Sequence, residues 1–431
     1  MMFAEPGLVR AATAGVPPVR AWMTIPFLLL LLAIAVGPFL NRRWWEQHYP
    51  KVSLGLGFLV VAHYSFFIDF RRMLEIAVDY FSFIVLIGSL FVAAGGILLH
   101  TDRRATPALN LLILASGAVM SNIIGTTGAS MLLIRPFIRI NRPRFSGFHL
   151  AFFIFVVSNL GGALTPIGDP PLLLGYLKGV PFQWTIVNIW PIWLTALLLV
   201  LGMFYALDWR SYRGWAAHQD HRALPGRLHV HGRRNLVFLL IILAAVFTST
   251  PAREVIMIAA AAAAYRFARK DALRANEFTF APIREVAVLF AGIFATMTPA
   301  LDWLNLNAGK FGLHTPGQFF WASGMLSSVL DNAPTYLNFL SAALGLHGLV
   351  LDAPGHMEVL IAQHGSFLLA ISVGSVFFGA MTYIGNGPNF MVKSIAEHHG
   401  VECPSFFGYM LRYSLPVLLP IFLVVWIMFF R

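Results

Sequence analysis

The chain has 431 residues, of which 58% are hydrophobic and only 11% are charged. A soluble domain carries about 25% charged residues, so this composition excludes an ordinary soluble enzyme or binding module. The net charge of +11 does not indicate nucleic-acid binding, because the arginines lie in short loops between apolar segments, as the positive-inside rule predicts.

Ten apolar segments approach the length of about 20 residues that a helix needs to cross a membrane. The predicted spans are residues 25–40, 52–68, 79–99, 146–177, 189–209, 235–250, 253–268, 284–301, 365–393 and 413–430. The first span follows an N-terminal segment, residues 1–24, and has no small-residue cleavage site behind it, so we expect a retained helix. The segments lack the alternation of a lipid-facing barrel. The predicted fold class is therefore an all-α polytopic membrane protein.

Two further apolar stretches, residues 106–140 and 315–346, are too long for one crossing and hold polar residues near the middle. We predict that each is a re-entrant helical hairpin, which enters the membrane and leaves by the same side. If the basic linker 210–234 is cytoplasmic, both ends of the first hairpin lie inside with their arginines. The ends of the second hairpin then lie outside, beside Asp302 and Asp352, and both termini are external.

The order of the segments repeats upside down in the two halves of the chain. Residues 25–209 and residues 235–431 each contain three spans, one hairpin, one interrupted span and a last span. The motif Thr-x-Ile-Gly-[Asp/Asn]-x-Pro begins at Thr165 in the first half and at Thr382, 217 residues later, in the second. Matched interruptions in inverted halves are typical of the binding site of a secondary transporter.

The polar residues at these interruptions are the candidates for binding an ion or a substrate. A broken helix in a bilayer exposes backbone groups that only protein or a water-filled cavity can satisfy, and its ends carry partial charges that attract ions. The simpler alternative is a set of proline and glycine kinks in packed helices, which the matched repetition disfavours. The candidate residues are Ser121, Asn122, Gly125, Thr126, Thr127, Ser158, Asn159, Thr165, Gly168, Asp169, Asp331, Asn332, Thr335, Thr382, Gly385 and Asn386.

Asp169 and Asp331 carry the strongest functional indication. An ionised carboxylate in the middle of a membrane costs about 2.5–3.5 kcal/mol on insertion scales, and no lysine or arginine lies within several residues of either one. A carboxylate without a fixed cation can exchange sodium for protons, because both compete for the same oxygens. The alternative for both residues is helix N-capping, and the two roles can coexist.

No other feature indicates an enzyme or a metal centre. The histidines of the linker, His218, His221, His229 and His231, are irregularly spaced in basic sequence, which favours a solvated loop over a metal site. The chain lacks the His-Glu-x-x-His metal helix and the Gly-x-Ser-x-Gly nucleophile turn.

The motifs resemble those of the ion transporter superfamily, which includes citrate and dicarboxylate carriers, arsenite carriers and NhaD-like sodium/proton antiporters. The resemblance covers about residues 25–430. Ser121-Asn122 is similar to the first hairpin-tip signature of that family, and Asp331-Asn332 stands at the second. Thr165–Asp169 and Thr382–Asn386 are similar to the paired breaks that complete two sodium sites. The resemblance implies sodium ligands at Asn122, Asp169, Asn332 and Asn386, a homodimer and an elevator-type movement.

The departures from the family's pattern favour one branch of it. Dicarboxylate carriers have threonine where this chain has Ile123 and Ala333, and Asp331 would repel a carboxylate substrate. The resemblance is closest to the sodium/proton antiporters, although related sequences with Gly-Asp-Pro-Pro are often labelled citrate transporters. We therefore predict a sodium/proton antiporter of a bacterial-type inner membrane, with no cofactor besides the transported sodium and protons and with membrane lipids as partners. The alternative is a sodium- or proton-coupled citrate or dicarboxylate symporter.

Overall fold

The computed structural model describes all residues except 1–18, 102–104, 143, 217–227 and 311. Most of the N-terminal segment 1–24, part of the linker 210–234, and the linker residues His218 and His221 lie outside the described residues. Within the described part of the chain, eight helices are long and apolar enough to cross a membrane. The prediction of a polytopic helical membrane protein is thus confirmed.

The helices follow the predicted order in both halves. In the first half they are η2 (Ala21–Thr24), α2 (Ile25–Leu40), α3 (Arg42–Phe67), α4 (Phe70–Gly95), α5 (Pro107–Asn141), α6 (Gly147–Val156), η3 (Leu160–Leu164), α7 (Pro170–Leu177) and α8 (Phe182–Ala216). In the second half they are α9 (Arg233–Ala245), α10 (Ala252–Phe267), α11 (Lys270–Ala275), α12 (Ala281–Asn307), η4 (Ala308–Lys310), α13 (Pro316–Ser327), α14 (Asn332–Leu346), α15 (His356–Phe378), η5 (Gly379–Met381), α16 (Gly387–His398) and α17 (Phe406–Tyr409), which a π turn (Met410–Ser414) joins to α18 (Leu415–Phe429).

The structure differs from the sequence analysis in one helix boundary and in one unexpected pair of strands. Helix α8 continues to Ala216 instead of ending near residue 209, so the start of the predicted linker is helical. Strand β1 (Leu98–Thr101) pairs antiparallel with β2 (Leu228–His231), where no strand was expected. Both strands lie just beyond helices, where backbone groups have no helical partners and can pair with each other. This sheet places His229 and His231 in a strand rather than in an irregular loop.

Helix α5 doubles back on itself, and we call it hairpin 1. Gly125 breaks the helix with φ of 77°, a left-handed backbone conformation that glycine adopts without steric cost. Asn110 and Asn141, near the two ends, exchange two hydrogen bonds of 2.8 Å. A straight helix would hold residues 31 positions apart at about 46 Å. This geometry is the one predicted for residues 106–140.

Helices α13 and α14 form the second hairpin, which we call hairpin 2. Thr315 caps α13 and accepts a hydrogen bond from the backbone N–H of Gln318, whose side chain in turn accepts one from the Thr315 N–H. The chain then turns between Ser327 and Asn332. The rings of Phe319 and Phe339, on the two arms, lie 6.1 Å apart, so the second arm returns beside the first.

The two interrupted spans have the same construction. Helix α6 gives way to η3, to extended backbone at Thr165 and Asp169, and then to α7, whose first residue is Pro170. Helix α15 gives way to η5, to extended backbone at Thr382 and Asn386, and then to α16. A proline in the first turn suits a helix start because the N–H at that position has no partner within the helix.

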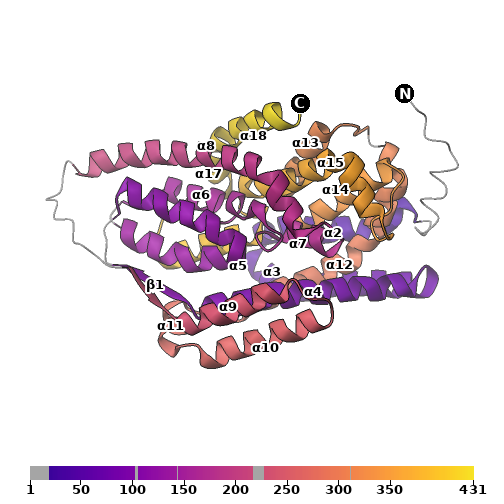
Figure 1. The fold of residues 1–431 in the computed structure, drawn as a ribbon, viewed down its shortest axis with the longest axis horizontal. Coiled ribbons are helices and arrows are strands. Elements are labelled where there is room, and N and C mark those ends of the chain that lie inside the picture. Colours follow the sequence, from indigo (N-terminus) through magenta and orange to yellow (C-terminus); the bar gives the residue numbers. More distant parts are fainter. Residues whose placement is uncertain (1–18, 102–104, 143, 217–227, 311) are drawn as a thin grey trace.

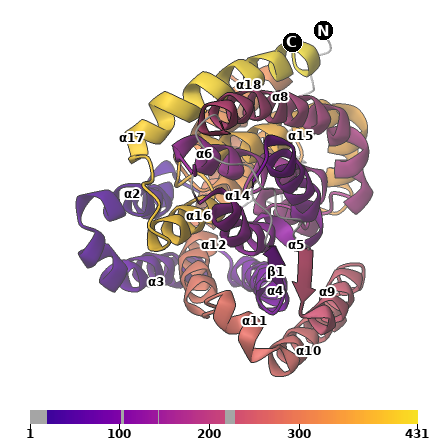
Figure 2. The same ribbon diagram turned by 90° about the vertical axis from the view of Figure 1, so that its left-hand side faces the viewer.

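The hairpins and interrupted helices lie between two outer groups of helices. In Figure 1, α9 and α10 lie on one side with α4, and α8 and α18 lie on the other, with α5, α6, α7 and α14 between them. Figure 2 shows the same order after a quarter turn and places α2 and α3 at the edge of the molecule. The interruptions of both halves are therefore enclosed by protein, as their exposed backbone groups require.

Candidate functional site

Asp169 lies at the centre of the site and has 1% of its surface exposed. Its carboxylate accepts three side-chain hydrogen bonds, from Thr126 of hairpin 1 at 2.8 Å, from Asn332 of hairpin 2 at 2.6 Å and from Asn386 of the second interruption at 2.9 Å. Although Asp169 occupies the N-cap position of α7, its side chain does not cap that helix. Within the described residues no lysine, arginine or histidine forms an ion pair with it. In the described part of the chain, the side chains that bond to this carboxyl group are all neutral donors.

The two interrupted helices cross at this point and are joined by amide side chains. The Asn386 amide donates to the Ser158 carbonyl at 3.1 Å and to Asn159 Oδ1 at 3.2 Å, as well as to Asp169. Asn159 donates to Asn389 at 2.7 Å, and Asn389 donates to the Thr382 carbonyl at 2.8 Å. The sequence analysis did not single out Asn389, which is the third residue of α16. These bonds make the two breaks one polar centre.

The tip of hairpin 1 holds the backbone of the first interruption. The Ser121 hydroxyl donates to the Val157 carbonyl at 2.7 Å. The Asn122 amide donates to the Gly161 carbonyl at 2.6 Å and accepts from the Leu164 N–H at 2.9 Å. The Thr165 hydroxyl donates to the Asn122 carbonyl at 2.6 Å. Both ends of the Asn122 amide are thus occupied by backbone groups, which a broken helix leaves without helical partners.

Hairpin 2 repeats these contacts with residues other than those that the sequence analysis paired. The Ser327 hydroxyl donates to the Ser375 carbonyl at 2.6 Å, and the Ser328 carbonyl accepts from the Thr382 hydroxyl at 2.6 Å. Ser327-Ser328 therefore corresponds to Ser121-Asn122, and the pairing of Asp331-Asn332 with that signature is wrong. Asn332 instead corresponds to Thr126, since both donate to Asp169.

Close backbone contacts between the interruption and the hairpin also match in the two halves. A Cβ atom on Gly162 would lie 2.5 Å from the Thr126 side chain and 2.8 Å from the Gly168 carbonyl oxygen. A Cβ atom on Gly379, 217 residues later, would lie 3.4 Å from the Asn332 amide and 3.3 Å from the Gly385 carbonyl oxygen. The Gly168 carbonyl also accepts from the Thr126 N–H at 2.8 Å. Glycine thus allows each hairpin to approach the unwound segment.

The second predicted carboxylate, Asp331, has a structural role in the described site. Its Oδ1 accepts a hydrogen bond of 3.0 Å from the Ala333 N–H and so caps α14, as the capping alternative predicts. Thr335 bonds back to the Asp331 carbonyl at 2.9 Å and makes no side-chain bond to Asp169. The Ser158 hydroxyl pairs with the Ser130 hydroxyl at 2.8 Å.

The predicted residues thus fall into groups with different positions. The side chains that donate to Asp169 are Thr126, Asn332 and Asn386. The side chains that form hydrogen bonds at the helix interruptions are Ser121, Asn122, Asn159, Thr165 and Thr382. Gly125, Gly168 and Gly385 allow the backbone to turn or to approach closely, and Asp331 and Thr335 form hydrogen bonds at the start of α14.

A small pocket borders Asp169. Its volume is about 30 Å³, and its walls come from the tip of hairpin 1, from the start of α7 and from one face of α4. Thr127 contributes to the tip, whereas Leu86, Ile87, Leu90 and Phe91 give α4 an apolar wall. A water molecule needs roughly 10–15 Å³ of such volume. The pocket therefore has room for one small ion or a few water molecules.

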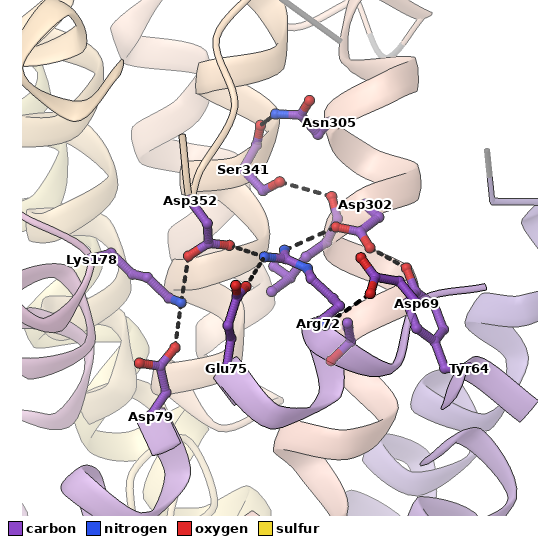
Figure 3. Close-up of polar contacts among 12 residues, drawn as sticks. Tyr64, Asp69, Arg72, Glu75, Asp79, Lys178, Asp302, Asn305, Ser341 and Asp352 are labelled. Atoms are coloured by element: carbon purple, nitrogen blue, oxygen red, sulfur yellow. Dashed lines mark hydrogen bonds and ion pairs between the residues drawn. The ribbon is translucent and has the colours of Figure 1, made fainter. Parts of the chain in front are cut away.

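A second polar cluster, which sequence reasoning missed, lies where α7 and hairpin 2 end (Figure 3). Arg72 binds Asp302 at 3.0 Å and also contacts Asp352. Lys178 binds Asp352 at 2.7 Å and also contacts Asp79. We call these five residues the ion network. Each appeared in the sequence only as a charge near the end of a span, and no sequence signal paired them.

Comparison with known proteins agrees with this architecture. Residues 17–430 match the family described as "Putative citrate transport". A protein of Mycobacterium tuberculosis (strain CDC 1551 / Oshkosh) named "Uncharacterized transporter" is 23% identical over 357 residues, which cover 76% of this chain and 80% of the relative. The "46 kDa membrane protein" of Mycobacterium leprae is 25% identical over 314 residues, 68% of this chain and 69% of the relative. With a family match over nearly its whole length, this protein is a membrane transporter that belongs to the family described as "Putative citrate transport".

Proposed function

We propose that this transporter exchanges sodium for protons at Asp169. The observation that carries the proposal is the burial of this carboxylate with three neutral donors and, among the described residues, no cationic partner. Burying an isolated charge is strongly unfavourable unless it is paired or neutralised. A proton or a bound cation each neutralises the carboxylate, and the two cannot occupy the same oxygens together.

The amides around Asp169 suit both states. Asn332 donates its Nδ2 to Asp169 while its buried Oδ1 has no hydrogen-bond partner. A half-turn of the amide brings Oδ1 toward the carboxyl group, where it accepts a hydrogen bond from a protonated carboxyl or shares a cation with it. Asn332 and Asn386 are therefore our candidates for switching between proton and sodium, with Thr126 as a hydroxyl ligand.

The pocket supports a small cargo. Its volume of about 30 Å³ fits one sodium ion with little water, and its α4 wall is apolar. A multiply charged organic anion would meet the negative charge of Asp169, with no described lysine or arginine paired to it. The family description nevertheless favours a second candidate, sodium- or proton-coupled citrate transport. In either case we expect an inner-membrane homodimer.

Reconstituted vesicles distinguish the two candidates. A preformed pH gradient should collapse when sodium is added, and Asp169→Asn should abolish this response while the protein still inserts. Potassium, lithium and citrate are added in separate samples, and radiolabelled citrate uptake is measured in parallel. Sodium-dependent citrate uptake without sodium-driven proton movement would replace the antiport proposal with the symport alternative. A fully active Asp169→Asn variant would remove Asp169 from the mechanism.

A further inference from the structure

The ion network joins two groups of elements. Arg72 and Asp79 belong to α4, and Asp302 lies near the end of α12. Lys178 directly follows α7, the helix that begins at Asp169, and Asp352 lies in the loop after α14, the helix that begins at Asn332. The network therefore connects α4 and α12 with the two elements that supply a carboxylate and an amide to the site.

The network and Asp169 lie at opposite ends of α7. The eight residues of α7 separate Asp169 from Lys178, and the nine helical steps between the two correspond to about 14 Å, or nearly half of a hydrocarbon core of about 30 Å. A second cavity of about 10 Å³ lies along this helix, lined by apolar side chains of α4, α7, α12 and α14. Asp79 and Lys178 also border it. The ion pair of Asp79 with Lys178 therefore joins α4 to the end of α7 beside this cavity.

Hydrogen bonds tie hairpin 2 to α12 beside the network, as Figure 3 shows. Asn305 donates to the Ser341 carbonyl at 3.1 Å and to the Leu349 carbonyl at 2.9 Å, and the Ser341 hydroxyl donates to the Leu301 carbonyl at 2.8 Å. Hairpin 1 differs, because none of its described side chains forms a hydrogen bond with α4. Instead, the pocket next to Asp169 lies between hairpin 1 and α4.

We propose that the ion network is a latch that closes the hairpin-2 end of the Asp169 site and fixes α7 and hairpin 2 to α4 and α12. This inference rests on the proposed function in one respect: a buried exchange site must open to both sides of the membrane in turn. The latch has to separate before cargo passes between α4 and α7 toward the hairpin-2 end. While it is closed, the site communicates only along hairpin 1.

The composition of the latch suits repeated opening. Side chains of Arg72 and Lys178 are 11% and 8% exposed, whereas those of Asp79 and Asp352 are 22% and 23% exposed. Burial acts to raise the pKa of Asp352, but the positive charges of Lys178 and Arg72 outweigh it and hold that pKa below its ordinary value. Asp352 therefore stays ionised at neutral pH. Each cation contacts two carboxylates of the network, and Arg72 also lies 3.8 Å from Glu75, so contacts can be released one at a time.

Thiol modification of the purified protein tests the latch without any cargo. The reporter is Leu337→Cys, at a buried position of hairpin 2 that borders the second cavity, in a Cys403→Ser background that removes the chain's single native thiol. The latch variant is Lys178→Gln with Asp79→Asn, which removes one positive and one negative charge. The matched control is Lys393→Gln with Glu397→Gln, which removes an ion pair of 2.7 Å within α16.

We expect the latch variant to react with a maleimide about tenfold faster or more, since each tenfold shift of an opening equilibrium corresponds to about 1.4 kcal/mol. The control should stay within about twofold. A second reporter, Ile87→Cys in the pocket beside hairpin 1, should not be accelerated. Equal rates in all variants, or equal acceleration at both reporters, would overturn the latch.

A salt titration keeps the test decisive if the latch variant folds poorly. Raising the salt concentration screens partly exposed charges, so Leu337→Cys in an otherwise intact latch should react faster at high salt, while Ile87→Cys should not. No salt dependence at either reporter would also overturn the inference. A protein that labels as expected but moves no sodium would retain the latch and lose the exchange proposal.

Discussion

Removing the Asn332 amide should shift the pH dependence of transport toward alkaline values. Asn332 donates to Asp169 Oδ2 at 2.6 Å from a fully buried position. Hydrogen bonds to charged groups contribute about 1.5–3 kcal/mol, and one pH unit corresponds to about 1.36 kcal/mol. In Asn332→Ala the ionised carboxylate loses this stabilisation, whereas the protonated carboxyl loses only a neutral hydrogen bond of about 0.5–1.5 kcal/mol, so Asp169 holds a proton more tightly. The pH of half-maximal sodium-driven proton movement should rise by about one unit.

Asn338→Ala is a matched control for this variant. Asn338 is a buried asparagine on the same helix, and its amide donates to the Pro334 carbonyl at 2.7 Å rather than to Asp169. Both substitutions remove an amide from α14, so any general loosening of hairpin 2 should affect them equally. The assay is pH-gradient dissipation in vesicles across a series of pH values. An unchanged midpoint in Asn332→Ala, or an equal shift in Asn338→Ala, would refute the role assigned to this amide.

Three further predictions concern the elements around the site. Asp331→Asn should keep the cap of α14, whereas Asp331→Ala should lower the free energy of unfolding by about 1 kcal/mol. An Asp331→Asn variant that is inactive but as stable as the wild type would show that the charge of Asp331 has a role in transport. Gly162→Ala should abolish transport in the vesicle assay, since the added Cβ would lie 2.5 Å from Thr126 Cγ2. Gly387→Ala should remain active in the same assay, because no atom beyond its neighbours in the chain lies within 4 Å of the added Cβ. Gly345→Ala should separate α14 from α12, since its Cβ would lie 2.1 Å from a backbone oxygen; a wild-type melting temperature would contradict this close approach.

The sequence predicts the interruptions because they depend on local chemistry. Thr165 and Asp169 stand in a seven-residue motif that concentrates glycine and prolines, which disfavour a continuous helix, and the same motif at Thr382 interrupts the second span. The turn at Gly125 follows for the same reason, since few residues other than glycine adopt its backbone conformation. Such signals need no knowledge of what packs against them.

The sequence alone does not predict which residues of the two hairpins correspond. A comparison of residue types pairs Asn122 with Asn332, but the two amides have different partners. The Asn122 amide binds backbone groups, and the Asn332 amide binds Asp169. The hairpins correspond with a shift of 206 residues, from Ser121 to Ser327, whereas the interruptions correspond with a shift of 217. A single shift applied to the whole chain therefore misplaces the second tip. Only the hydrogen bonds reveal which residues occupy equivalent positions.

The ion network was hidden for another reason. Its members are far apart in the chain, and Arg72 is 280 residues from Asp352. In the sequence such residues indicate only which side of the membrane a loop lies on. The predicted side is still informative, because it is the same for all four of these residues. The predicted topology places the segment ends that contain Arg72, Lys178, Asp302 and Asp352 on the external side. Their meeting at one end of the fold supports that topology independently of the arginines that defined it.

The latch also gives the two pseudo-symmetric halves different roles. A symmetric transporter would open equally easily at either end. Here, among the described residues, the ion network and three hydrogen bonds join α7 and hairpin 2 to α4 and α12, whereas hairpin 1 is joined to the segment between α11 and α12 by the ion pair of Arg135 with Glu277 at 3.7 Å. Desolvation offsets much of the attraction in buried ion pairs, so the network need not trap the protein. Shifting a two-state equilibrium from 1:99 to 99:1 takes about 5.5 kcal/mol. A net contribution of a few kcal/mol would therefore favour the state open along hairpin 1 and leave the opposite state accessible once cargo binds at Asp169.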